Sequence, residues 1–223
     1  MPRTARNTPG GFVYHVLNRA VASLPLFEKE ADYEAFERVL EQAQERNPTR
    51  ILAYCVMPTH WHFVLWPRKD GEITAFLRWL THTQTMRWHA NHDTSGTGHL
   101  YQGRFKSFPV EEDDHFYAVV RYVERNAVRA NLIQRAEQWR WSSMWHRRFG
   151  DSGQRSLLSV WPLPKPRDWL RRVNQAQSAA EEEALGQAIK RSSPLGSERW
   201  IKNTAVRLGL QYTLRPRGRP KKT

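Results

Sequence analysis

The stretch YCVMPTHWHFVLWP, residues 54–67, holds two histidines inside a run that is otherwise almost wholly apolar. The segments on either side of its Pro-Thr pair are rich in strand-forming residues, and so short a connection predicts a hairpin. Alternate side chains of a strand point to the same face, so His60 and His62 project together while Trp61 points to the core. The function of these two neighbouring imidazoles has to be inferred together with the other motifs of the chain.

Working outward from this hairpin, the hydrophobic periodicity predicts strands and helices in the order strand, helix, strand, strand, helix, strand, helix. That order favours an α+β fold, a ferredoxin-like antiparallel sheet with helices on one face. We expect strands over 12–20, 50–57, 60–67 and 101–111, and helices over 30–47, over 72–92 and from Asp113 onward.

The pattern changes after residue 148, which predicts a main domain over residues 1–148. Three prolines close together mark 149–167 as a linker. Residues 168–208 predict a small basic helical appendage, in which Ser197 is a good N-cap. A basic tail over 209–223 completes this division of the chain.

The formal net charge of +13 over 223 residues favours a polyanionic partner. Nucleic acid is the first candidate and a membrane surface the second. An apolar run of about 18 residues, long enough to span a bilayer, is absent, and the N-terminus does not read as a secretory signal. The single cysteine, Cys55, excludes a disulfide framework and predicts a small buried side chain. The chain is expected to be cytoplasmic.

The histidine pair suits a shared metal ion, because imidazole is the commonest protein ligand for metals. Two histidines cannot saturate a metal, so a third amide or carboxylate ligand is required. Such a site would keep positions open for a phosphate and would accept Mg²⁺ or Mn²⁺, among others. Spacing alone leaves open that His60 and His62 are simply two histidines of a strand.

A helix downstream carries RYVERNAVRANL, in which Tyr122 and Asn126 lie one turn apart on the same face. Asn126 offers a carbonyl oxygen to a hard metal ion. Tyr122 offers a phenol that could attack a phosphodiester and conserve the bond energy as a phosphotyrosine. The alternative, in which Tyr122 packs and Asn126 caps the helix, stays open on this spacing.

Four motifs together, YHVLNRA, VMPTHWHFVLWP, GHLYQGRFKSFPVE and RYVERNAVRANLI followed by WRWSS, resemble the HUH single-tyrosine transposases. Among these the chain is most similar to the REP-associated tyrosine transposases. The resemblance implies a ferredoxin-like catalytic domain, with His60, His62 and Asn126 as ligands of Mg²⁺ or Mn²⁺ and Tyr122 as the nucleophile. Ala127 departs from the family, which usually has proline there, and removes no ligand.

The resemblance also implies an activity. Such enzymes cleave and rejoin single-stranded DNA at hairpins of palindromic repeats, through a 5′-phosphotyrosine intermediate. We therefore expect a nucleoid-associated cytoplasmic protein that acts as a monomer or homodimer, without a membrane partner. Two other functions remain open: a DNA-binding regulator of palindromic repeats without turnover, and a metal-independent RNA-binding protein.

Basic side chains near these motifs are candidate DNA contacts. Arg104 and Lys106 alternate with aromatic residues, a pattern suited to backbone contact and base stacking. Arg121, Arg125 and Arg129 recur every four residues and predict a basic stripe on a helix. A sheet face for the aromatic residues and a solvated helix face for the arginines are the alternatives.

The C-terminal residues 216–220, PRGRP, match the core of an AT-hook. In that reading Arg217 and Arg219 enter a narrow A·T minor groove, while the prolines keep the segment extended. A solubilising basic tail is the equally simple alternative.

Overall fold

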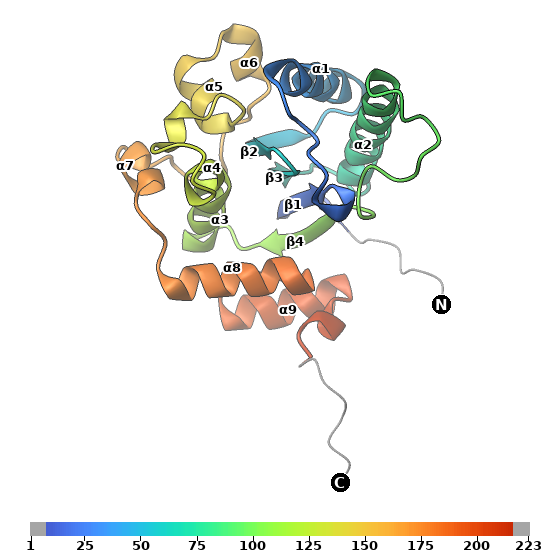
Figure 1. Cartoon of the computed structure of the whole chain (residues 1–223). Coiled ribbons are helices and arrows are strands. Elements are labelled where there is room, and N and C mark those ends of the chain that lie inside the picture. Colours follow the sequence, from blue (N-terminus) through green and yellow to red (C-terminus); the bar gives the residue numbers. More distant parts are fainter. Residues whose placement is uncertain (1–7, 216–223) are drawn as a thin grey trace.

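The computed structural model describes residues 8–215, so the AT-hook match with Arg217 and Arg219 lies outside the described residues. A four-stranded antiparallel sheet occupies the centre, with helices on both of its faces and two helices, α8 and α9, beside β4 (Figure 1). No helix within 8–215 is long and apolar enough to cross a membrane.

The sheet has the strand order β2-β3-β1-β4, which is the ferredoxin-like arrangement expected from the sequence. The strands are β1 (Val13–Arg19), β2 (Arg50–Met57), β3 (His60–Trp66) and β4 (Lys106–Val110). The hairpin is confirmed, because the last residue of β2 pairs with the first residue of β3 across the Pro-Thr turn.

The fourth strand is shorter than the predicted 101–111. Tyr101 makes only an isolated bridge to Ala20, and the strand proper begins at Lys106. The intervening Gly103 has a φ of +159° and its neighbours are exposed, so the chain forms a loop here and pairs as a strand only afterwards. This loop forms one wall of a cavity.

Two long helices cover the first face of the sheet, α1 (Glu30–Arg46) and α2 (Glu72–Asn91). Their apolar sides pack with Trp61 and Phe63 of β3 into one buried cluster. Trp61 therefore points to the core as predicted, because it alternates with the two histidines along the strand.

Shorter helices cover the opposite face. The sequence predicted helices on one face of the sheet, and the structure has them on both. The apolar residues of that face, such as Cys55, Val64 and Phe108, need a cover of their own, and α3 and its neighbours bury them. The covering helices are α3 (Asp114–Glu124), α4 (Asn126–Arg129), α5 (Ser143–Phe149) and α7 (Trp169–Asn174). The short helix α6 (Ser152–Ser156) buries none of its residues, and 3-10 turns lie at Val21–Ser23, Ala136–Gln138 and Gln211–Thr213.

Segment 149–167, expected to be a linker, contacts the core. The Trp161 indole N–H donates to the Leu52 carbonyl at 2.8 Å, and the Ser159 N–H donates to the Ile51 carbonyl at 2.8 Å. These bonds cover the outer edge of β2. Whether the boundaries at 148 and 167 separate independently folding units stays a prediction.

The C-terminal helices are α8 (Ala179–Arg191) and α9 (Glu198–Leu208), with Ser197 as the N-cap of α9 as expected. The predicted helical segment 168–191 is divided, because Ser178 caps a new helix after α7. Between α8 and α9, the Leu195 N–H donates to the Pro109 carbonyl at 3.0 Å and closes the β4 edge.

Candidate metal and nucleophile site

The histidine pair lies at the start of β3, on the face covered by α3. His62 is 3% exposed and His60 is partly exposed. Their ring centroids are 5.0 Å apart and the ring planes meet at 83°. The two imidazoles are therefore neighbours in space, as the alternation of a strand requires.

Each imidazole has its Nδ1 atom engaged. His60 Nδ1 lies 3.1 Å from Thr59 Oγ1, and His62 Nδ1 lies 2.9 Å from Nε2 of His15 on β1. In an imidazole the Nε2 atom lies on the opposite edge of the ring from the bonded Nδ1. These contacts thus hold the rings so that the Nε2 atoms can serve as ligands.

Sequence analysis missed His15, which is fully buried. It lies on the same face as the pair because β1 and β3 are adjacent and Leu17 pairs with His62, which places His15 on the diagonal. The alternating strand pattern contained the signal. The strand register that brings His15 to His62 could not be read from the sequence.

All three histidines are held in the neutral form. Burial lowers the pKa of His15 to about 3 and that of His60 to about 4, with smaller contributions at His60 from Arg19 and Arg129. Burial also lowers the pKa of His62 well below its usual value, and the neighbouring histidines add to this. Only neutral imidazole binds a metal, so the environment favours ligation.

Tyr122 lies near the C-terminal end of α3 and faces the histidines. Its ring centroid is 5.7 Å from that of His62 and 6.2 Å from that of His15. An Arg129 Nη2 atom donates to the phenolic oxygen at 3.0 Å, and the guanidinium lies 4.7 Å from the ring centroid. Burial raises the pKa of Tyr122, while Arg129 and Arg19 oppose that rise.

Asn126 begins α4, directly after a break in the helix at Arg125. The Arg125 N–H donates to the Arg121 carbonyl and the Arg129 N–H to the Arg125 carbonyl, so the helical path continues across the break. Tyr122 and Asn126 therefore stay one turn apart. Asn126 is 2% exposed, and its Nδ2 atom has no hydrogen-bond partner within residues 8–215.

These residues fit a divalent metal ion. The set comprises two neutral imidazoles and a buried amide whose Oδ1 atom can serve as a ligand, while its Nδ2 donor lacks a hydrogen-bond partner among the described residues. The amide oxygen suits a hard ion such as Mg²⁺ or Mn²⁺ and the imidazoles suit transition-metal ions, so the set with its open positions fits a divalent ion without selecting one.

The five candidate DNA-contacting residues within the described chain differ in their surroundings. Arg104 and Lys106 are exposed. Arg129 is bonded to Tyr122, and Arg125 is half-buried. Arg121 forms an ion pair of 2.6 Å with Glu181 of α8, so the three arginines do not form a uniform exposed stripe.

The aromatic residues expected to stack on bases belong to the core. Tyr101, Phe105 and Phe108 are 7%, 8% and 1% exposed. The Tyr101 hydroxyl accepts a hydrogen bond of 3.1 Å from the Trp61 indole, and Phe108 packs 4.9 Å from His15 between ring centroids. The sheet-face alternative is therefore correct for Phe108 of β4, while Tyr101 and Phe105 pack into the core from the loop before that strand.

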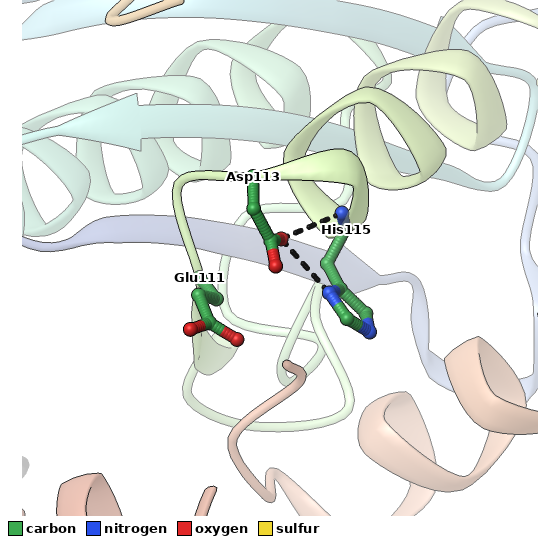
Figure 2. A group of neighbouring side chains, drawn as sticks. All are labelled: Glu111, Asp113 and His115. Carbon is green, nitrogen blue, oxygen red and sulfur yellow. Dashed lines mark hydrogen bonds and ion pairs between the residues drawn. The ribbon is translucent and has the colours of Figure 1, made fainter. Parts of the chain in front are cut away.

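A second group of ligand-type side chains lies at the other end of α3. Figure 2 shows Glu111, Asp113 and His115, whose ligand atoms lie within 4.8 Å of one another. Asp113 caps α3 by accepting from the His115 N–H at 2.8 Å, and it contacts Nδ1 of the same residue at 2.8 Å. Glu111 accepts from the Ser197 N–H at 2.6 Å. The carboxylates of this group are thus engaged in fixing α3 and α9.

Residues 10–126 match the family described as "Transposase IS200 like". The chain belongs to the IS200-like transposases. The match contains the histidine pair and extends to Asn126, so it includes Tyr122 as well. Membership in this transposase family indicates an enzyme of the DNA-cleaving kind. No curated protein matches the sequence.

Solved structures are also similar to this IS200-like transposase, and two of them are compared with it. One is a REP-associated tyrosine transposase bound to a REP hairpin, with 18% identity and a TM-score of 0.53, covering 80% of this chain and 96% of that one. At this identity the likeness shows the fold alone. The other is a Deinococcus radiodurans protein described as a transposase, with 17% identity and a TM-score of 0.40, covering 59% of this chain and 92% of that one. This second likeness is too weak to support a conclusion.

Proposed function

We propose that this chain is a metal-dependent endonuclease and strand transferase that acts on single-stranded DNA at hairpins of palindromic repeats. The observation that carries the proposal is the meeting of His62 and Tyr122, with 5.7 Å between ring centroids, while Arg129 donates to the phenolic oxygen. Both elements belong to one chain, so we propose that the nucleophile and the histidines act in cis. The substrate places the protein at the nucleoid in the cytoplasm.

Tyr122 would act as the nucleophile. Its phenolic oxygen attacks the phosphorus, the new O–P bond forms and the bond from phosphorus to the 3′ oxygen breaks. The products are a 5′-phosphotyrosine and a free 3′ hydroxyl, which takes up a proton while the tyrosine proton passes to solvent. Attack by another 3′ hydroxyl reverses these bond changes and joins the strands, since the bond energy is conserved.

Arg129 would prepare the phenol for this step. Burial raises the pKa of Tyr122 and thereby disfavours the phenolate, which is the reactive form. The guanidinium opposes this effect because it donates a charge-assisted hydrogen bond to the phenolic oxygen. This arginine was expected to contact DNA, and its position supports a role at the nucleophile.

His60, His62 and Asn126 would hold the metal, with His15 fixing the ring of His62. When bound, the ion neutralises charge on the scissile phosphate and so lowers the barrier to attack. The chain's own part is to keep both imidazoles neutral and oriented and to seat the phosphate beside Tyr122.

A hairpin substrate is supported by the similar solved structure, which contains a REP hairpin. The net charge of +13 agrees with binding to a polyanion. A regulator that binds DNA without turnover would have the same charge, but it would have no need of a tyrosine held against buried neutral histidines.

The test uses a labelled hairpin oligonucleotide with single-stranded flanks, incubated with the full-length protein and Mn²⁺. We expect a covalent adduct that survives denaturing electrophoresis, and we expect Tyr122→Phe to lack it while binding the hairpin normally. Tyr117→Phe is the matched control, since that hydroxyl donates to the Pro164 carbonyl on another side of the same helix. An adduct formed by Tyr122→Phe would reject the assignment. Binding without any adduct in the wild type would favour the regulator.

A further inference from the structure

A cavity of about 810 Å³ opens between α2 and the loop that leads to β4. We propose that it binds an unpaired nucleotide of the DNA strand that enters the active site, an inference that rests on the proposed function. Its lining combines cationic, hydroxyl, amide and apolar side chains from three elements. Asn18 comes from β1, Arg78, Thr81 and His82 come from α2, and Tyr101 and Arg104 come from the loop before β4.

The charge of the lining favours an anion. Arg78 and His82 project from α2, and His99 and Arg104 from the loop; all four are exposed. None of the described residues that line the cavity is acidic. A phosphate group of a nucleotide would therefore meet only positive or neutral side chains, and arginine suits it because the guanidinium can form two parallel hydrogen bonds.

The remaining walls suit a nucleobase. Buried Leu100, Tyr101 and Phe105 form an apolar part of the lining. The hydroxyls of Thr81 and Thr85 donate to carbonyls of their own helix, at 2.7 and 2.8 Å, which leaves their oxygen lone pairs as acceptors. A few directed polar groups on an apolar wall are the usual features of a site for a small planar ligand.

The size of the cavity suits a single unpaired nucleotide. Small-molecule sites commonly have volumes of roughly 300–1,000 Å³, and the cavity falls within that range. It would accommodate a nucleotide but not a duplex. The occupant would thus come from the single-stranded part of a substrate, next to a hairpin or beyond the cleavage position.

The cavity is joined directly to the strand ends that carry the metal ligands. The Asn18 side chain donates to the Gly103 carbonyl at 3.3 Å, and the Gln102 N–H donates to the Arg19 carbonyl at 3.0 Å. Arg19 pairs with His60 in the sheet. A DNA strand that passes His60 and the exposed Arg19 would therefore reach the mouth of the cavity.

The same loop makes a second connection to the strands that carry the metal ligands. The Tyr101 hydroxyl accepts from the indole of Trp61, which lies between the two histidines in sequence. Since alternate residues of β3 face opposite sides, the cavity and the histidines occupy the two faces of one end of the sheet. Contacts made in the cavity would therefore help to fix which phosphate lies at Tyr122.

The first experiment compares two oligonucleotides, a hairpin with oligo(dT) flanks and the same hairpin without flanks, in the presence of chelator so that cleavage does not interfere. The double variant Arg78→Ala/Arg104→Ala should bind the flanked hairpin about tenfold more weakly, with a shallower salt dependence, and should bind the flankless hairpin nearly as well as the wild type. Arg38→Ala/Arg87→Ala is the control, because it removes the same charge from exposed helix positions outside the cavity.

The second experiment locates the nucleotide. We expect 4-thiothymidine, placed in turn along both flanks, to crosslink at one position to peptides within 72–91 or 99–105. Crosslinks confined to other peptides, or an equal loss of affinity for both oligonucleotides, would overturn the assignment. The outcome is separate from that of the cleavage test. Flank-dependent binding without any phosphotyrosine adduct would support the cavity and reject the proposed function, and an adduct without flank dependence would do the reverse.

Discussion

The two ends of α3 each carry ligand-type side chains, but they differ in what those side chains already bind. At the N-terminal end, Asp113 caps the helix and Glu111 holds the start of α9. At the C-terminal end, roughly 13 Å along the axis, Tyr122 faces buried neutral histidines and Asn126 has an unsatisfied amide.

The two groups show that residue type alone does not identify a metal site. The acidic group has carboxylates, which a metal would attract, yet their oxygens already accept hydrogen bonds that begin helices. The histidine group has fewer charges, but its rings are fixed through Nδ1, so the Nε2 atoms can serve as ligands. Unused ligand atoms in a fixed arrangement are the better indicator.

Removal of one histidine at each end of α3 should have the largest difference in effect. We expect His62→Ala to lower Mn²⁺-dependent adduct formation by about 10³-fold, the scale of losing a main electrostatic contribution to catalysis. His115→Ala should leave it unchanged, because His115 contacts only Asp113 among the interactions described above. Single-turnover adduct formation and calorimetric Mn²⁺ titration measure both effects. Loss of Mn²⁺ binding in His115→Ala alone would reverse the assignment of the two ends.

A smaller effect is expected at the nucleophile. Arg129→Gln should slow adduct formation by about 10²-fold, because it removes the charged donor to the phenolic oxygen. The pKa of Tyr122 is already raised by burial, and without Arg129 it rises further, so the activity of the variant should increase up to a higher pH than that of the wild type. The pH profile is the decisive measurement. Equal slowing at every pH would mean that Arg129 acts on DNA instead.

The buried partner of His62 should have a still smaller effect. His15→Ala removes the contact that fixes the His62 ring, so Mn²⁺ affinity should fall by about 10- to 100-fold, as for other residues that orient metal ligands. His15→Gln should restore part of the affinity, since an amide oxygen can accept from His62 Nδ1. Calorimetric titration of each variant with Mn²⁺ measures the affinity. An unchanged Mn²⁺ affinity in a folded His15→Ala variant would remove His15 from the site.

The smallest effect is expected at the cap of α3. Asp113→Ala should lower the free energy of unfolding by about 1 kcal/mol, the usual loss for an N-cap. Mn²⁺ affinity and adduct formation should stay at the wild-type level. Asp113→Asn serves as the control, because asparagine caps helices about as well. Urea unfolding followed by circular dichroism measures the change. A drop in Mn²⁺ affinity instead would mean that the group of Glu111, Asp113 and His115 binds the metal.

The sequence predicted the sheet, and it predicted which of the candidate side chains are neighbours, because both follow from local periodicity. The roles of these residues as metal ligands and nucleophile rest on the family resemblance and stay a prediction. The alternation along β3 placed His60 and His62 on one face, and the helical spacing placed Tyr122 near Asn126. His15 and the bond from Arg129 to Tyr122 were not predicted, because they depend on strand register and on a side-chain conformation, which local patterns do not determine.

The same limit applies to the loop before β4 and to segment 149–167. Aromatic residues at 101, 105 and 108 have similar local patterns whether they face solvent or a core, and the structure buries all three. Proline-rich residues 149–167 looked independent of the core in sequence. Trp161 nevertheless bonds to β2, a contact between residues more than a hundred positions apart.

The closed β4 edge has a consequence for synthesis of the protein. Leu195, which completes that edge, leaves the ribosome long after β4 itself. Until then the nascent chain presents an unpaired strand edge, the kind of surface on which other chains can add strands and aggregate. Shielding of that edge therefore depends on the last part of the chain, and the long sequence separations of the contacts around the sheet favour slow folding. A chain truncated before Leu195 should for this reason aggregate during expression even though every residue assigned to chemistry is present.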